Sequence, residues 1–314
     1  MEEILYRAVS YLLIILVGAS MKKAGLFRDS EFKTLAKVML YITLPCAIIY
    51  NFSNIEFDFS LLVITAMGVG TGLIYILIAF IEGKLLGRSR EIPFDIINFS
   101  GYNIGNFSMP FAQSFLGPLG VVTISLFDTG NAVICNGGSK AVAELIKGKG
   151  TGSQQNPWRE MLRSIKTIAR VLSRSMPFMT YLVMIVLVML HVPIPQVVSS
   201  FSGTVAQANA FVAMLMIGVG FKLNLKGEGI FHVVRILVSR YAVTAVFILI
   251  AYRMLPFDLE IRQALVILLL SPIASANPAF TDALGEDFEL ASTVNSISML
   301  ISIVSITTAL LVML

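Results

Sequence analysis

Charged residues are scarce in this chain. Only 13% of its 314 residues are Asp, Glu, Lys or Arg, against about 25% in an ordinary soluble domain. Hydrophobic residues make up 56% of the sequence, and they occur in runs rather than at the spacing of a single helix face. Runs of about 20 residues with few charges match the hydrocarbon core of a bilayer. The sequence therefore predicts an all-α integral membrane protein, with the lipid bilayer as its surroundings.

Residues and motifs that carry enzyme chemistry are also few. There are two cysteines and two histidines. Cys46 and Cys135 fall in predicted spans, where free buried thiols are expected, and His191 and His232 lie near span ends without ligand partners at useful spacing. Neither a GxSxG or HExxH motif within a span nor a GxxxxGK[ST] phosphate loop occurs. We therefore expect no enzyme activity, no cofactor, no firm metal site and no nucleic-acid partner.

The apolar runs predict about ten transmembrane spans. They lie near residues 4–21, 35–53, 61–82, 94–116, 119–146, 174–191, 198–221, 229–252, 262–285 and 288–313. Lys and Arg concentrate in alternate connections, which the positive-inside rule assigns to the cytoplasm. We therefore expect a multi-pass plasma (inner) membrane protein with both termini extracytoplasmic. The first residues, MEEILYR, are more acidic than basic, so we expect a retained first helix and not a cleavable signal peptide.

A polar, basic connection divides the predicted spans into two halves of five. The expected division is residues 1–146, a cytoplasmic basic loop at 147–173, and residues 174–314. Because five is odd, the second half starts on the opposite side of the membrane from the first. If the halves are repeats, they have the inverted topology common in secondary transporters. The basic amphipathic part of the loop is expected at the lipid surface, as an anchor or as a regulatory lipid site.

The fourth and ninth spans are interrupted by Pro110 and Pro278, each followed after the same interval by Leu-Gly. Proline removes a backbone donor, and the freed carbonyls must face protein or a wet cavity. Two ordinary proline kinks are the alternative. The matching positions favour two discontinuous helices whose second halves point their N-termini at one shared site. The polar residues expected to bind substrate there, with the two prolines, are Asn103, Asn106, Ser108, Ser275 and Asn277.

Asp128 lies about a third of the way into the fifth span. An ionised carboxylate there costs about 2.5–3.5 kcal/mol on insertion scales, so we expect it to face the interior, as a proton or Na⁺ site or as a protonated packing residue. Asn131 shares its helix face, and Asn295 has nearly the same place in the last span. These three are the predicted ion-coupling residues, although helix packing explains Asn295 equally well. With Arg240 placed at a helix end, no central Lys or Arg is expected to neutralise an anion.

The sequence resembles the auxin efflux carrier family, within the bile acid/auxin carrier superfamily. Leu44-Pro45 in LYITLPCAIIYNF is similar to the proline-bearing second helix of the family. The segment from Asn103 to Pro110 is similar to its crossover, and Leu270–Leu314 follows its C-terminal pattern. The chain lacks the long cytoplasmic loop of the plant carriers and so looks like a compact prokaryotic-type member.

This resemblance implies ten helices in two inverted repeats, with spans 4 and 9 crossing at their prolines. It implies a scaffold of spans 1, 2, 6 and 7, through which the protein forms a homodimer. A transport bundle of spans 3–5 and 8–10 would move against the scaffold in an elevator-type mechanism. The implied function is secondary transport of a small organic acid anion. From Asp128 itself we expect coupling to H⁺ or Na⁺, and we expect Pro45 to shape the site or to form a plain kink. A non-transporting ligand sensor that uses the same pocket is the alternative.

Overall fold

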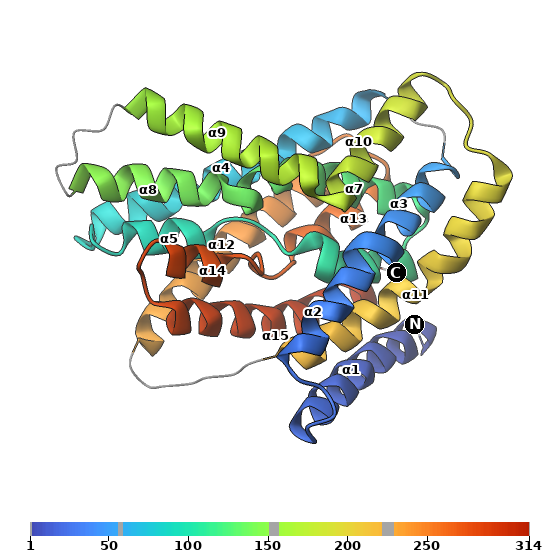
Figure 1. The fold of residues 1–314 in the computed structure, drawn as a ribbon, viewed down its shortest axis with the longest axis horizontal. Coiled ribbons are helices and arrows are strands. Elements are labelled where there is room, and N and C mark those ends of the chain that lie inside the picture. The colour runs from blue at the N-terminus through green and yellow to red at the C-terminus, as the bar shows by residue number, and fades with distance from the viewer. Residues whose placement is uncertain (1, 56–58, 151–156, 222–228, 314) are drawn as a thin grey trace.

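The protein is built from α-helices joined by short connections (Figure 1). The computed structural model describes residues 2–55, 59–150, 157–221 and 229–313, and none of these residues belongs to a named β-strand. The helices are α1 (Glu2–Lys23), α2 (Asp29–Val38), α3 (Leu44–Phe52), α4 (Val63–Leu85), α5 (Ile92–Phe99), α6 (Met109–Phe115), α7 (Pro118–Val133), α8 (Ser139–Gly150), α9 (Pro157–Arg174), α10 (Met176–Met189), α11 (Gln196–Gly220), α12 (Ile230–Arg253), α13 (Leu259–Leu269), α14 (Asn277–Ala283) and α15 (Phe288–Met313). Three π-helical turns, Met39–Thr43, Ile104–Ser108 and Ile134–Gly138, and one 3₁₀ turn, Phe59–Leu62, connect some of them.

Seven helical segments in the described ranges are long and apolar enough to cross a membrane. They are Leu5–Lys23, Ser30–Phe52, Ser60–Leu85, Pro118–Gly148, Gln196–Gly220, Ile230–Arg253 and Phe288–Met313. The bent pair of α9 and α10, which meet at 82°, would add an eighth. The predicted spans near 94–116 and 262–285 each consist of short helices separated by non-helical chain. An all-α, membrane-embedded fold is therefore confirmed.

Glycines allow the long helices to approach closely at two crossings. Gly218 of α11 faces the backbone of α1, where an added Cβ would lie 2.1 Å from the carbonyl oxygen of Ile15. Gly68 and Gly130 have the same role where α4 crosses α7, and a Cβ on Gly130 would lie 2.0 Å from the carbonyl oxygen of Thr65. Small residues permit such contacts between membrane helices, where van der Waals packing drives association.

The basic connection between the two halves contains a helix. Helix α9 packs against α8 and α10 (Figure 1). Leu172, a residue of α9, is buried, whereas Lys166 and Arg170 of the same helix are exposed. A helix with one apolar and one basic face is suited to lie in the plane of the membrane surface. The stretch GTGSQQ at 150–155 lies, apart from its first residue, outside the described residues.

The interruption in the second half ends directly before Pro278, where it was expected, whereas the interruption in the first half lies at residues 100–103, ahead of the helical turn Ile104–Ser108 that leads to Pro110. Helix α5 ends at Phe99 and α13 ends at Leu269, whereas both prolines occupy the first turn of the following helix, α6 or α14. Proline is compatible with that turn because its missing N–H has no helical partner there. The non-helical chain is instead found around Gly101, at φ +78°, and at Ser271–Ala276.

Candidate functional site

The two non-helical stretches lie side by side and pair through their backbones. Tyr102 forms an antiparallel β-bridge with Ile273, and the N–H of Asn103 donates to the carbonyl of Pro272 at 2.9 Å. Each interruption leaves backbone N–H and C=O groups without helical partners. The pairing gives some of these groups partners in the other stretch, as burial away from water requires. We call residues 100–103 and 271–276 together the crossover.

Asn131, on α7, holds the first stretch of the crossover. Its Oδ1 accepts from the N–H of Tyr102 at 3.0 Å, and its Nδ2 donates to the carbonyl of Tyr102 at 2.9 Å and to Oδ1 of Asp128 at 3.0 Å. The thiol of Cys135, one turn further along, contacts the same Asn131 oxygen at 3.2 Å and the Tyr102 carbonyl at 3.5 Å. The Asn131 amide therefore pairs with Tyr102 as a neighbouring strand would.

Helix α15 holds the second stretch in a similar way. Nδ2 of Asn295 donates to the carbonyls of Ile273 and Ala274 at 3.0 and 3.1 Å, and the hydroxyl of Ser298 accepts from the N–H of Ile273 at 3.2 Å. The two bridged residues, Tyr102 and Ile273, are thus both bonded to the long helix that follows their interrupted segment. Asn131 and Asn295 support backbone in this structure, whatever else they bind.

The end of α5 is capped from the opposite half of the chain. Nδ2 of Asn277 donates to the carbonyls of Ile97 and Ser100 at 2.5 and 3.1 Å. The guanidinium of Arg240, on α12, donates to the carbonyl of Phe99 and to that of Gly101, the latter at 2.9 Å. Donors at a helix C-terminus satisfy its last carbonyls and oppose the negative end of its dipole.

Arg240 is the site residue that the sequence reasoning missed. It lies in the middle of α12, is only 1% exposed, and has its guanidinium 4.7 and 4.9 Å from the ring centroids of Tyr75 and Tyr102. The expectation that no Lys or Arg would be central was therefore wrong. The error came from assigning Arg240 to a helix end. An arginine near the middle of an apolar 24-residue helix is the signal that could have identified it.

A cavity of about 160 Å³ opens beside the crossover. Among its lining residues are five of the predicted set, namely Asn103, Asn106, Asp128, Asn131 and Ser275. From the other side Leu44 of α3 and Tyr181 of α10 close it. Tyr181 is 2% exposed, and its hydroxyl has no hydrogen-bond partner among the described residues. An unpartnered buried hydroxyl beside a polar cavity is the arrangement expected where a ligand or water supplies the missing bond.

Among the described residues that line this cavity, Asp128 contributes the only carboxylate. Its Oδ1 accepts from Asn131, and its Oδ2 faces Gly105, where an added Cβ would lie 3.4 Å away. In the part of the chain that the structure describes, no Lys or Arg forms an ion pair with it. A carboxylate in this setting can bind a proton or a small cation.

The remaining predicted residues lie outside the cavity lining. Ser108 is fully buried and its hydroxyl bonds to that of Ser271, so it joins the two interrupted segments. Asn277 and Asn295 make the backbone contacts already described. Pro110 and Pro278 begin short helices, and Pro45 is buried in the first turn of α3, next to the cavity-lining Leu44.

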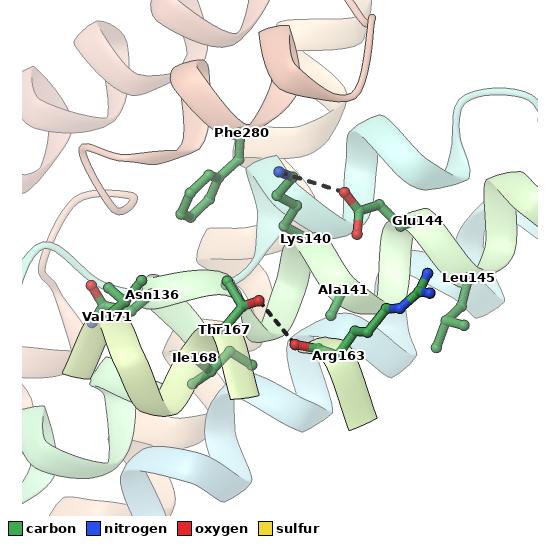
Figure 2. A pocket seen from close by; sticks show the side chains of 11 residues that line it. Asn136, Lys140, Ala141, Glu144, Leu145, Arg163, Thr167, Ile168, Val171 and Phe280 are labelled. Atoms are coloured by element: carbon green, nitrogen blue, oxygen red, sulfur yellow. Dashed lines mark hydrogen bonds and ion pairs between the residues drawn. The ribbon is translucent and has the colours of Figure 1, made fainter. Parts of the chain in front are cut away.

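A second, larger cavity of about 500 Å³ adjoins the first, because Asn136 lines both. In Figure 2, Lys140 and Glu144 of α8 lie on one side of this cavity and Arg163 and Thr167 of α9 on the other. Lys140 pairs with Glu144 at 3.5 Å. The charged side chains that line this second cavity are Lys140, Glu144 and Arg163, which leaves one positive charge in excess.

A separate ionic cluster joins α4, α5 and α12. Arg235 donates to Glu82, Glu91 and Asp95 at 2.8, 3.1 and 2.7 Å, and Nε2 of His232 lies 2.6 Å from Oδ1 of Asp95. The expectation that His232 has no ligand-type partners was therefore wrong: its partners are distant in sequence. The ligand atoms of Glu91, Asp95 and His232 lie within 4.8 Å of one another, but Arg235 already supplies positive charge to both carboxylates.

A scan against protein-family models and a search of curated proteins found no match to this chain. The chemistry of the site must therefore be judged from its own residues. The crossover cavity combines amides, a hydroxyl without a partner, one carboxylate and a buried guanidinium behind the backbone. Such a set can bind a small polar anion together with a cation.

Proposed function

We propose that this protein is a secondary transporter that moves a small organic acid anion across the membrane by alternating access. The observation that carries the proposal is the crossover itself. Two interrupted helical segments pair beside a polar cavity that contains Asp128, within a fold of long apolar helices. Interrupted backbone within a membrane is tolerated where it is buried or lines a cavity, and in transporters such places hold substrate and coupling ions.

The proposed architecture is ten spans in two inverted repeats, residues 1–146 and 174–314, separated by the basic connection at 147–173. The similar placement of the two interruptions supports this division. Each lies between two long helices and is bonded to the second of them. Moreover, Asn131 follows Gly117 at nearly the same interval as Ser298 follows Gly285.

Membership of the auxin efflux carrier family, as a compact member, is part of the same proposal. Helices α1, α3, α10 and α11 would form the scaffold and the dimer interface, and the remaining spans the moving bundle. Packing of α1 and α3 against α11, and of α4 against α7, agrees with such a division (Figure 1). The basic side would face the cytoplasm of a plasma (inner) membrane, with both termini outside.

The proposed cargo is a small carboxylate, held by the amides of Asn103 and Asn106 and by the hydroxyl of Tyr181. An ionised Asp128 in the same cavity would repel an anion. A proton or Na⁺ bound at Asp128 would remove that repulsion, so we propose coupling to one of these cations. The second cavity, lined by Lys140, Glu144 and Arg163, carries one positive charge in excess and would draw anions toward the crossover cavity.

Transport by the purified protein in liposomes tests the proposal. Uptake of radiolabelled mono- and dicarboxylates is measured with and without proton and sodium gradients. We expect one of the gradients to stimulate uptake by the wild type, Asp128→Asn to abolish that stimulation, and the exposed Asp282→Asn to retain it. Stimulation that survives in Asp128→Asn would contradict the role of Asp128. Thermal stabilisation by a carboxylate without any flux would instead support a non-transporting sensor.

A further inference from the structure

The positive charge of Arg240 has no acidic partner nearby. Its hydrogen bonds go to two backbone carbonyls and its flat faces to two tyrosine rings. None of the ion pairs among the described residues includes it. Arginine stays protonated even when buried, so a full positive charge persists immediately behind the crossover.

Capping α5 does not by itself require this charge. Asn277 caps the same helix end with a neutral amide. Hydrogen bonds and stacking on tyrosine offset part of the desolvation of a buried guanidinium, but a buried charge generally needs a counter-charge. Among its described lining residues, the crossover cavity contains one carboxylate, that of Asp128.

Arg240 and Asp128 are connected through one short piece of backbone. Arg240 donates to the carbonyl of Gly101 at 2.9 Å. The next residue, Tyr102, is bonded through both its N–H and its carbonyl to Asn131, which donates to Asp128 at 3.0 Å. The polar connection between the two charges therefore runs through Gly101, Tyr102 and Asn131 in sequence.

The charges of Arg240 and Asp128 determine the net charge of the site when it is empty and when it is loaded. With Asp128 ionised, the empty site carries no net charge. A bound monoanion alone would leave one negative charge in a buried place. A monoanion together with one monovalent cation on Asp128 restores neutrality, whereas a dianion with one cation does not.

We infer that Arg240 is the fixed counter-charge of this site, and that the protein carries one monoanion together with one monovalent cation bound at Asp128. The inference rests on the proposed transport function and adds to it the charge class and the stoichiometry. Both residues lie in the part proposed to move, on α7 and α12. The loaded and the empty forms would therefore each cross the membrane without net charge.

Other ionisable groups around Asp128 do not alter this balance. Tyr181 of α10, Cys135 of its own helical segment and Tyr102 of the crossover are neutral at physiological pH. Helices α3 and α6 carry no charged residue. On α4 and α13 the charged residues lie at the helix ends, where they are Glu82, Lys84, Glu260 and Arg262. The described basic residues of α9 are Arg163, Lys166, Arg170 and Arg174; all are exposed, and Arg163 also lines the second cavity.

The test uses the full chain in liposomes with a potassium–valinomycin potential. The probes are radiolabelled lactate and benzoate as monoanions and succinate as a dianion. For each net charge moved per cycle, a potential of about 100 mV changes the accumulation ratio about 50-fold. We expect wild-type accumulation of a monoanion to follow either a proton gradient or a sodium gradient and to be independent of the potential. Whichever gradient drives accumulation identifies the coupled cation.

The variants separate the roles of the two charges. Arg240→Gln keeps donors for the carbonyls but removes the charge, so we expect the half-saturating monoanion concentration to rise about tenfold and the initial rate to become voltage-dependent. Arg240→Lys keeps the charge, so its initial rate should stay independent of the potential, and the exposed Arg170→Gln should match wild type. Asp128→Asn should carry the anion alone, so that its accumulation follows the potential. This last variant tests the stoichiometry even if Arg240→Gln does not fold.

Two results would overturn the inference while leaving transport intact. One is wild-type monoanion accumulation that follows the potential by a full charge. The other is an Arg240→Gln variant with wild-type affinity and voltage-independent rates. Preferred transport of succinate over both monoanions would also contradict it. If no probe is transported by the wild type under any gradient, the proposed function fails, and the inference fails with it.

Discussion

Replacing Asn131 by alanine is expected to destabilise the protein by about 2–4 kcal/mol. Asn131 is 2% exposed, and its amide is the acceptor for the N–H of Tyr102 at 3.0 Å. Losing that acceptor leaves a buried donor unpaired, which costs about 1–3 kcal/mol. The carbonyl of Tyr102 loses its donor at 2.9 Å but keeps the weak contact with the Cys135 thiol at 3.5 Å. We therefore expect the loss of this second hydrogen bond to cost near the lower end of about 1–3 kcal/mol.

Asn136→Ala is the matched control for this change. Asn136 lies one and a half turns further along, and its side chain donates to the carbonyl of Ala132 at 2.8 Å within the same helical segment. We expect that loss to cost about 0.5–1.5 kcal/mol. The free energy of unfolding of each variant is measured by denaturant titration in mixed micelles. If Asn131→Ala is no more destabilising than Asn136→Ala, the argument that the Asn131 amide supports the crossover backbone is wrong.

Two further changes test packing and charge elsewhere in the fold, with the same unfolding assay. Gly130→Val places atoms against the backbone of α4 and should cost at least about 1–3 kcal/mol. Gly70→Ala, whose added Cβ meets no atom within 4 Å, should be neutral or slightly stabilising. Equal effects of the two changes would contradict close packing of α4 on α7. Arg235→Leu leaves Asp95, itself 1% exposed, without its arginine partner and should cost about 3–5 kcal/mol. A loss no greater than that of the exposed Arg170→Leu would show that the ionic cluster contributes little.

The helical, membrane-embedded fold was predictable because lipid demands it. A bilayer leaves the backbone few choices, so an apolar run such as Ala242–Ala251 can be assigned to a helix from its composition alone. Asp128 could be placed beside the interrupted segments for a similar reason. A carboxylate in such a run must face the protein interior.

The details of the crossover were not predictable, because they depend on pairs far apart in the sequence. Pro110 indicates an interruption, but the non-helical chain lies earlier, where Tyr102 pairs with Ile273. No local sequence pattern identifies Ile273 as that partner. Arg240 was misplaced since its two carbonyl partners lie about 140 residues earlier in the chain. The pairing of His232 with Asp95 was missed for the same reason.

The hydrogen bonds of Asn131 and Ser298 with the crossover limit how the crossover can move. They hold both stretches of the crossover to α7 and α15, so neither stretch can move away from its helix without losing several buried hydrogen bonds. The facing wall offers Leu40, Leu44, Phe178 and Tyr181, whose side chains form no hydrogen bond to the crossover in the described part of the chain. Under the proposed function, the two stretches would therefore move together with α7 and α15 relative to this wall.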